Sequence, residues 1–428
     1  MRPFVMFLQI RSLCTMLNEI EEHQVDWSSL PENLLHLISR RLTLLDFIRF
    51  GAVCVSWYQS ITDVDNYINR LRLSKTSALQ VPWMILPVLP HRLRGNKDRN
   101  LRTIFSLSDG GKTFNFRLPT HHSSSRCAGS SDGWLLMVDE LSEMSMVNPI
   151  YGVEIALPSI ATHPNVTPKH DKHGRRVESY NIMWRAGVEE DWPVWRAKMM
   201  YYNKAIFCRD IDIVAVIHFF GHRIAIARAG DDRRGRWTEL EFPSNTGFTD
   251  LMYHGGRLYV FNDGDQVAVF EDLPSRIRRG GGGGTDQSPT RILGTLSKEW
   301  DGNKRYIVMS SIGRLLRVYR TWRRDETMDF EVFRMDGDGC DWVQVKSIGD
   351  CALFLGVNHS LCLPVEGVSG VKRNCIYFTD DHQEAIFVDR HGVRDLGVFN
   401  IEDGSVERYF HKQQCLFPPP LWFMPNLP

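Results

Sequence analysis

The sequence lacks closely spaced cysteines and long hydrophobic runs. Its 9 cysteines are scattered over 428 residues, and no two of them have Cys-x-x-Cys spacing. This distribution argues against a zinc ribbon, a dithiol redox motif and a disulfide framework, and it favours a reducing compartment, the cytoplasm or the nucleus. No stretch approaches the roughly 18 consecutive apolar residues of a membrane-spanning helix, so we expect no membrane partner.

An excess of charge of either sign is also missing. The chain has 51 Lys and Arg against 51 Asp and Glu, which gives a formal net charge of +0. Overall charge therefore gives no reason to expect nucleic acid as a partner. The hydrophobic content of 43% is that of a globular chain, and the length suits two domains.

Complete phosphate-binding and metal-binding motifs are absent as well. Residues 110–113 end like a P-loop, but Ser106 stands where that motif needs Gly, and a strand pattern follows. Three histidines, His163, His170 and His173, have a spacing that a metal could use, but they lie in a polar segment without cysteines. Acidic residues are plentiful, yet none stands out as a catalytic pair. We predict no catalytic residue, no cofactor and no metal.

Residues 26–61 carry the strongest helix signals of the chain. Ser29 and Glu32 match a capping box, with Pro31 at an early helical position. Apolar residues then recur at helical spacing in three short segments, namely Leu34, Leu35, Ile38 and Leu42, then Leu45 and Ile48, and finally Val53, Trp57 and Ile61. Three short helices cannot bury all their apolar surface on one another. They either pack on the rest of the chain or bury the surplus in a partner protein.

The same stretch resembles an F-box. The matching residues are Leu30-Pro31-Glu32, Leu34-Leu35, Ile38, Arg41-Leu42, Asp46, Arg49, Val53-Cys54 and Trp57, whereas Tyr58 replaces the Arg that usually follows this Trp. The resemblance implies docking on the Skp adaptor subunit of a cullin-RING ubiquitin ligase. Carried over by position, it implies that the Skp-binding residues are Leu30, Pro31, Leu34, Leu35, Ile38, Val53 and Trp57.

After Val81 the pattern changes to short β-branched and aromatic runs. Asp109-Gly110 separates two such runs, which is a strong hairpin signal. A Gly followed by an apolar run recurs at Gly133, Gly256 and Gly313. Weak recurrence of such units every 40 to 60 residues predicts a β-propeller, and about 340 residues supply six or seven blades. A pair of β-sandwiches is the alternative. Trp-Asp does not recur, so this is not an ordinary WD-repeat chain.

The second part is similar to plant F-box proteins whose C-terminal part is a KIB-type β-propeller. The similarity rests on Pro82-Trp83-Met84-Ile85-Leu86-Pro87, Arg117-Leu118-Pro119, Ser131-Asp132-Gly133-Trp134-Leu135, Asn148-Pro149, Leu157-Pro158 and residues 418–425. It implies a propeller that recruits a protein substrate for ubiquitination.

Two segments of the predicted propeller have the composition of insertions. Residues 163–200 hold three Trp with little alternation, and residues 274–290 contain five consecutive Gly. The second segment is predicted to be a flexible loop. The first is either a binding loop or a segment whose Trp side chains pack onto a blade.

Together these observations predict a multidomain α and β protein. An extension (1–22) precedes a three-helix F-box domain (23–73) and an all-β propeller (80–428). The predicted function is a non-catalytic substrate receptor that binds the Skp adaptor, through it the cullin-RING ligase, and an unidentified protein substrate. A propeller-fold enzyme with a structural helical cap is the alternative. A helix-turn-helix is disfavoured because the third helix lacks the basic residues that phosphates require.

Overall fold

The structure is a computed structural model in which two compact units, Met1–Ala78 and Leu79–Pro428, can be distinguished. It describes residues 26–39, 42, 44–51, 53–62, 81–86, 100–108, 110–119, 122, 124–150, 152–185, 187–231, 235–243, 246–277, 286–294, 304–323, 326–336, 341–381, 395–409 and 420–425. The predicted extension over 1–22 and the predicted helix over 66–73 lie outside the described residues.

The first unit contains a 3-10 turn and three short helices. These are η1 (Trp27–Ser29), α2 (Glu32–Ser39), α3 (Leu44–Gly51) and α4 (Val55–Thr62). The Asp26 carboxylate caps η1 by accepting a hydrogen bond from the Ser28 amide (3.0 Å). The Ser29 hydroxyl, which the capping box would direct to the first turn of α2, donates to the Asp26 carbonyl instead. The three predicted helices are confirmed. The side-chain cap that the structure shows, Asp26, belongs to η1 and not to α2.

The core of the first unit is small. Leu35 from α2, Phe50 from α3 and Trp57 from α4 form it, with Leu30, Leu42 and Cys54 packed at its edge. The Phe50 and Trp57 rings lie 4.3 Å apart between centroids, and the Trp57 indole donates a hydrogen bond to the Trp27 carbonyl (2.8 Å). One residue from each helix therefore holds the unit together, and most of the other apolar side chains that the structure describes in this unit are exposed.

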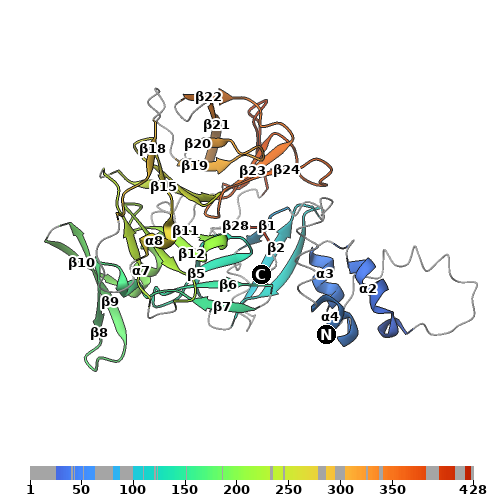
Figure 1. Cartoon of the computed structure of the whole chain (residues 1–428), viewed down its shortest axis with the longest axis horizontal. Coiled ribbons are helices and arrows are strands. Elements are labelled where there is room, and N and C mark those ends of the chain that lie inside the picture. The colour runs from blue at the N-terminus through green and yellow to red at the C-terminus, as the bar shows by residue number, and fades with distance from the viewer. Residues whose placement is uncertain are drawn as a thin grey trace, which may run out of the picture. The chain divides into compact units, whose positions relative to one another are not determined.

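Six sheets of the second unit form the blades of a β-propeller (Figure 1). Blade 1 is β28 (Leu421–Phe423), β1 (Trp83–Leu86), β2 (Leu101–Ser106) and β3 (Lys112–Arg117); blade 2 is β4 (Arg126–Ser131), β5 (Trp134–Val138), β6 (Met144–Asn148) and β7 (Val153–Ala156); blade 3 is β11 (Tyr202–Cys208), β12 (Ile213–His218), β13 (Arg223–Arg228) and β14 (Thr238–Leu240). Short helices η4 (Arg209–Ile211) and α8 (Leu273–Arg276) lie in connections.

Blade 4 is β15 (Phe248–His254), β16 (Arg257–Asn262), β17 (Val267–Phe270) and β18 (Arg291–Leu293); blade 5 is β19 (Lys304–Met309), β20 (Leu315–Arg323), β21 (Glu326–Asp336) and β22 (Asp341–Val345). Blade 6 has the order β24 (Leu361–Pro364), β23 (Cys351–Leu355), β25 (Cys375–Phe378), β26 (Gly397–Asn400) and β27 (Val406–Arg408), with β23 and β25 parallel. One strand of each blade contacts the next around the centre, in the order β28, β4, β11, β15, β19 and β24. The expected propeller is confirmed, with six blades among the described residues.

The recurring glycines mark the turn between the first two strands of a blade. Asp132 and Gly133 join β4 to β5 and have φ angles of 49° and 83°. Gly255 and Gly256 join β15 to β16, and Gly313 (φ 74°) lies between β19 and β20. Glycine adopts a positive φ at little cost, and glycine therefore occupies corresponding turns in three blades. The weak repeat in the sequence is therefore a repeat of blade geometry.

The last strand of the chain closes the ring. β28 pairs antiparallel with β1, which places Trp83 opposite Phe423 and Ile85 opposite Leu421. Trp422 is buried edge-on against the stacked Phe354 and Tyr377 rings of blade 6, whose centroids lie 5.2 and 6.2 Å from its own. Residues more than 330 positions apart in the chain thus share one sheet, so closure depends on a non-local pairing.

Truncating Trp422 should open this closure. We expect Trp422→Ala to lower the free energy of unfolding by about 3–5 kcal/mol, because a fully buried indole leaves a cavity that the blades cannot fill. Urea unfolding followed by fluorescence measures this change. Trp195→Ala is the matched control, since that indole is 61% exposed, and it should change stability by less than about 0.5 kcal/mol. Equal effects of the two substitutions would contradict the closure.

Residues 163–200 form a small sheet and a helix, not an irregular loop. It forms a separate three-stranded sheet, β8 (Val166–His170), β9 (Val177–Arg185) and β10 (Val188–Pro193), followed by α7 (Val194–Met200), and η3 (Ile160–Thr162) precedes it. Trp184 and Trp192 pack on Phe220, with ring centroids 5.0 and 5.1 Å away, whereas Trp195 is exposed. In Figure 1 this sheet stands at the periphery of the propeller. Two of the three indoles are therefore anchors on blade 3.

Candidate functional site

The first unit exposes a row of large apolar side chains. Leu34 and Ile38 on α2 are 42% and 40% exposed, and Val53 in the turn before α4 is 47% exposed. Four further residues have side chains that are at least half exposed, namely Trp27, Leu37, Val55 and Tyr58. We call these seven residues the apolar helical surface. Isolated exposed apolar residues are ordinary, but this many within 32 residues of chain is the pattern of a protein–protein interface.

The seven predicted Skp-binding residues divide into two groups. Leu34, Ile38, Val53 and Pro31 are exposed, whereas Leu35 is 1% exposed and Trp57 is 6% exposed. Leu30 lies half-buried at the edge of the core. Leu35 and Trp57 are part of the core that holds α2 and α4 together, and their contact with a partner stays a prediction. Leu37, Val55 and Tyr58 are exposed residues that the sequence comparison did not select.

At the centre of the propeller, one buried ion pair ties four blades together. Lys204 on β11 lies 2.5 Å from the Asp250 carboxylate on β15. The other carboxylate oxygen accepts hydrogen bonds from the Ile307 amide on β19 (2.9 Å) and the Ser360 hydroxyl before β24 (3.1 Å). Lys204 also donates to the Gly356 carbonyl (3.2 Å). Every charge in this group is compensated, which is the condition for burying it.

The carboxylate of this ion pair is not free, as a catalytic carboxylate of the enzyme alternative would have to be. Asp250 is occupied by a lysine and three further donors, including the Leu251 amide. Residues 129–133 also have Gly-x-Ser-x-Gly spacing, as in a nucleophile elbow, but Ser131 ends β4 and a second strand follows. Its buried hydroxyl donates to the Phe207 carbonyl (2.9 Å). These groups connect blades.

Acid should weaken this centre through His359, whose ring Nε2 is buried without a hydrogen-bond partner among the described residues. Burial, with Lys204 and His254 nearby, lowers the pKa of His359 to about 4. The unfolded chain, with a pKa of about 6.5, takes up the proton first as the pH falls. Stability is thus retained above pH 6.5 and is lost between pH 6.5 and 4, by about 2 kcal/mol for this partly exposed ring. Urea unfolding at several pH values should show a smaller acid loss for His359→Gln; an equal loss would contradict this assignment.

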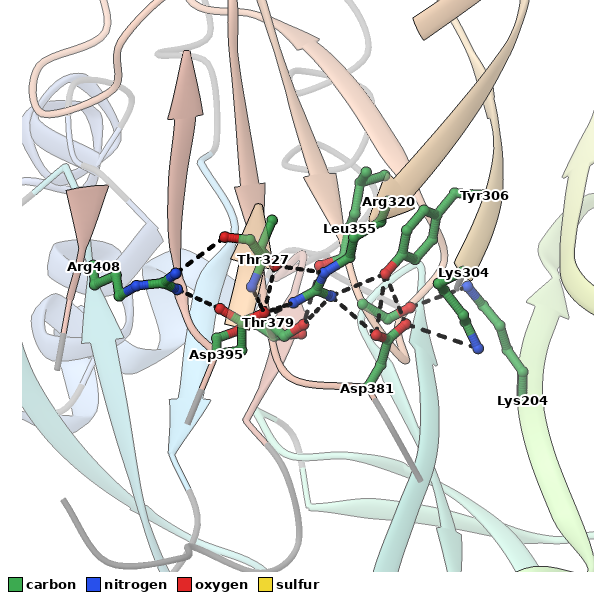
Figure 2. A network of polar contacts seen from close by, with 11 residues as sticks. Lys204, Lys304, Tyr306, Arg320, Thr327, Leu355, Thr379, Asp381, Asp395 and Arg408 are labelled. Atoms are coloured by element: carbon green, nitrogen blue, oxygen red, sulfur yellow. Dashed lines mark hydrogen bonds and ion pairs between the residues drawn. The ribbon is translucent and has the colours of Figure 1, made fainter. Parts of the chain in front are cut away.

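A second buried network joins blades 5 and 6 around Arg320 of β20 (Figure 2). The guanidinium lies 3.1 Å from Asp381 and 2.9 Å from Asp395, and it donates to the Tyr306 hydroxyl (3.1 Å) and the Thr379 carbonyl (2.9 Å). Burial alone would lower the pKa of Arg320, but Tyr306 and the two carboxylates outweigh it and raise the pKa. The arginine is therefore a permanent cation that locks two blades.

The edge of this network reaches the last blade strand. Arg408 on β27 pairs with Asp395 (2.5 Å) and donates to the Thr327 carbonyl (3.0 Å). Lys304 lies 4.0 Å from Asp381 on the other side, as Figure 2 shows. Such networks favour one arrangement of the blades over others. The network thus joins blades 5 and 6 at their buried polar groups.

The three histidines considered as metal ligands do not converge. His163 is buried beside η3, whereas His170 and His173 are exposed around the turn between β8 and β9. His163 instead lies with His218 and Glu239. The sequence did not indicate that pairing, Lys204–Asp250 or the Arg320 network, because the partners come from separate parts of the chain and no local spacing connects them.

Each of the two units matches a known protein family. Residues 27–69 match the F-box domain, and residues 104–400 match the KIB1-4 beta-propeller. None of the helices that the structure describes has the length and apolar content to span a bilayer.

Similar proteins from Arabidopsis thaliana span almost the whole chain. "Probable F-box protein At4g22060" is 22% identical over 94% of this chain and 96% of its own length. "F-box protein KIB4" is 24% identical over 92% of this chain and 94% of its own, and "F-box protein KIB3" is 25% identical over 92% and 82%. The similarity thus includes the order of the two units.

Proposed function

Because the chain belongs to the F-box proteins that carry a KIB1-4 β-propeller, we propose that it is the substrate-recognition subunit of a Skp–cullin–F-box ubiquitin ligase. The observation that carries this proposal is the apolar helical surface, which is displayed by a unit whose core, among its described residues, consists of three large side chains with three more at its edge. Such a surface is costly to leave in water and is stabilised by a partner.

The scale of the docking energy is adequate. Burying one large apolar side chain fully is worth about 1.5–3 kcal/mol. Leu34, Ile38 and Val53, with their exposed neighbours on the apolar helical surface, therefore offset the cost of association, which is about 4–15 kcal/mol. In this proposal Pro31 and Leu30 border the interface. Leu35 and Trp57 act indirectly, by holding α2 against α4.

The propeller would hold the protein substrate, and its contribution to ubiquitination would be proximity. Docking keeps a substrate lysine near the ubiquitin-conjugating enzyme carried by the cullin assembly and raises its effective concentration. A propeller locked by buried ion pairs suits this role, because a rigid platform loses little conformational entropy on binding. The complex would act in the cytoplasm or the nucleus, and no nucleic acid or membrane takes part.

Assembly with a cullin tests the proposal. The full-length chain is mixed with the Skp adaptor and the N-terminal part of a cullin, and the mixture is analysed by gel filtration with light scattering. One complex containing a single copy of each protein is the expected result. Elution of this chain apart from a preformed Skp–cullin complex would overturn the proposal.

A further inference from the structure

His163, His218 and Glu239 bring three metal-ligating groups together on blade 3. His163 follows η3, His218 ends β12 and Glu239 lies in β14. His163 Nδ1 lies 3.0 Å from one Glu239 oxygen, and His218 Nε2 lies 3.2 Å from the same oxygen. Both imidazole side chains have 0% exposure, whereas the carboxylate is 17% exposed and gives the cluster an edge toward solvent.

The chemistry of these three groups suits a divalent transition metal. Two imidazoles and one carboxylate form a frequent zinc ligand set, with bonds of about 2.0–2.2 Å. Two ligand atoms on a tetrahedral ion with such bonds are about 3.3 Å apart. The two nitrogen–oxygen separations are only a few tenths of an ångström shorter, and all three ligand atoms lie within 4.8 Å of one another, so the three groups can reach one ion with small adjustments of their side chains.

The groups around the cluster are also suitable. The Tyr202 hydroxyl lies 3.3 Å from His163 Nε2 and can accept its proton, as the outer partner of a metal-bound imidazole does. His218 Nδ1 has no partner among the described residues.

We propose that His163, His218 and Glu239 form a binding site for one divalent transition-metal ion, with Zn²⁺ the best match. His163 belongs to the segment that leads into the β8–β10 sheet, whereas His218 and Glu239 belong to blade 3. The bound ion cross-links the two. It fixes the base of the peripheral sheet on the blade, next to the Trp237 ring that stacks on His163 with centroids 5.2 Å apart.

Metal titration of the full-length chain tests the site. The protein is treated with a chelator, dialysed and titrated with ZnCl₂ in a calorimeter, and with CoCl₂ while the visible spectrum is recorded. We expect one equivalent of each ion to bind, an absorption of tetrahedral Co²⁺, and a higher Tm with Zn²⁺. Absence of saturable binding would overturn the proposal and leave a hydrogen-bonded triad.

Four substitutions locate the ion. Glu239→Gln keeps the shape and an acceptor oxygen but removes the charge, and His218→Gln removes a ligand; each should weaken Zn²⁺ binding at least about 100-fold. Tyr202→Phe should weaken it about 10- to 100-fold, as loss of an outer partner does. The matched control, His170→Gln with His173→Gln, replaces two exposed histidines and should leave binding unchanged. Loss of binding in the control, or unchanged binding in Glu239→Gln, would overturn the assignment.

X-ray absorption of the Zn²⁺-loaded wild-type chain gives an answer even if a variant misfolds. Two imidazole nitrogens with only oxygen or nitrogen as further neighbours are expected. A sulfur neighbour would place the ion at cysteines and would contradict the site.

Discussion

Leu34→Asp combined with Ile38→Asp should abolish binding to the Skp adaptor, with an increase in Kd of at least about 1000-fold. Both side chains are exposed on α2 and lie outside the Leu35–Phe50–Trp57 core. Burying two unpaired carboxylates in an apolar interface costs several kcal/mol each, and 1.4 kcal/mol is tenfold in affinity. Isothermal titration of the adaptor into each purified chain measures the effect.

The control for this variant is Ile312→Asp, which adds the same charge at an isoleucine of the propeller that is 76% exposed. It should bind the adaptor with the affinity of the wild type. Retained binding by the Leu34/Ile38 variant, with unchanged circular dichroism, would show that the docking surface lies elsewhere. Trp57→Ala should also lose binding, but by a different route: helical signal is lost with it, because this indole is core.

Arg320→Met should lower the free energy of unfolding of the propeller by about 3–5 kcal/mol. The substitution removes the cation but leaves Asp381 and Asp395 buried, and breaking one side of a buried network is far more costly than the network is worth. Lys304 and Arg408 remain near the two carboxylates and limit the loss. Urea unfolding monitored by tryptophan fluorescence measures the change.

Two further variants serve as controls for this prediction. Arg257→Met removes an exposed arginine that pairs with Glu271 (2.6 Å), and it should cost less than about 1 kcal/mol. Arg320→Met combined with Asp381→Leu and Asp395→Leu should recover part of the lost stability, because the two carboxylates that Arg320 compensates are then no longer buried. A free energy of unfolding of Arg320→Met within about 1 kcal/mol of the wild-type value would show that the network does not hold the blades together.

Local signals explain what could be predicted from the sequence. Helical spacing placed α2, α3 and α4, and Asp-Gly or Gly-Gly turns placed the hairpins of several blades, because both depend on neighbouring residues. Gly110 and Gly111, with φ of 68° and 77°, lead into β3 as a turn should, and no phosphate-binding loop forms there. The Gly280–Gly284 run lies outside the described residues.

Non-local partners explain what could not be predicted. Pro168 and a charged turn mask β8 and β9, so the segment had the composition of a loop, although β8, β9 and β10 pair with one another in chain order. The Arg320 partners lie 61 and 75 residues away, and Lys204 meets Asp250 from another blade. The sequence also did not show which apolar residues are exposed. Leu34 and Leu35 are adjacent leucines, and their positions on α2 make Leu34 a surface residue and Leu35 a core residue.

The most direct test of the account is the affinity of the Skp adaptor for the full-length chain beside a chain that starts at Leu79. Circular dichroism and thermal unfolding first establish that the shortened chain keeps the β-sheet signal of the propeller. The account predicts saturable 1:1 binding by the full-length chain and no measurable binding by the shortened one. Equal binding by both chains, or binding by neither, would contradict the assignment of the helical unit as the docking module.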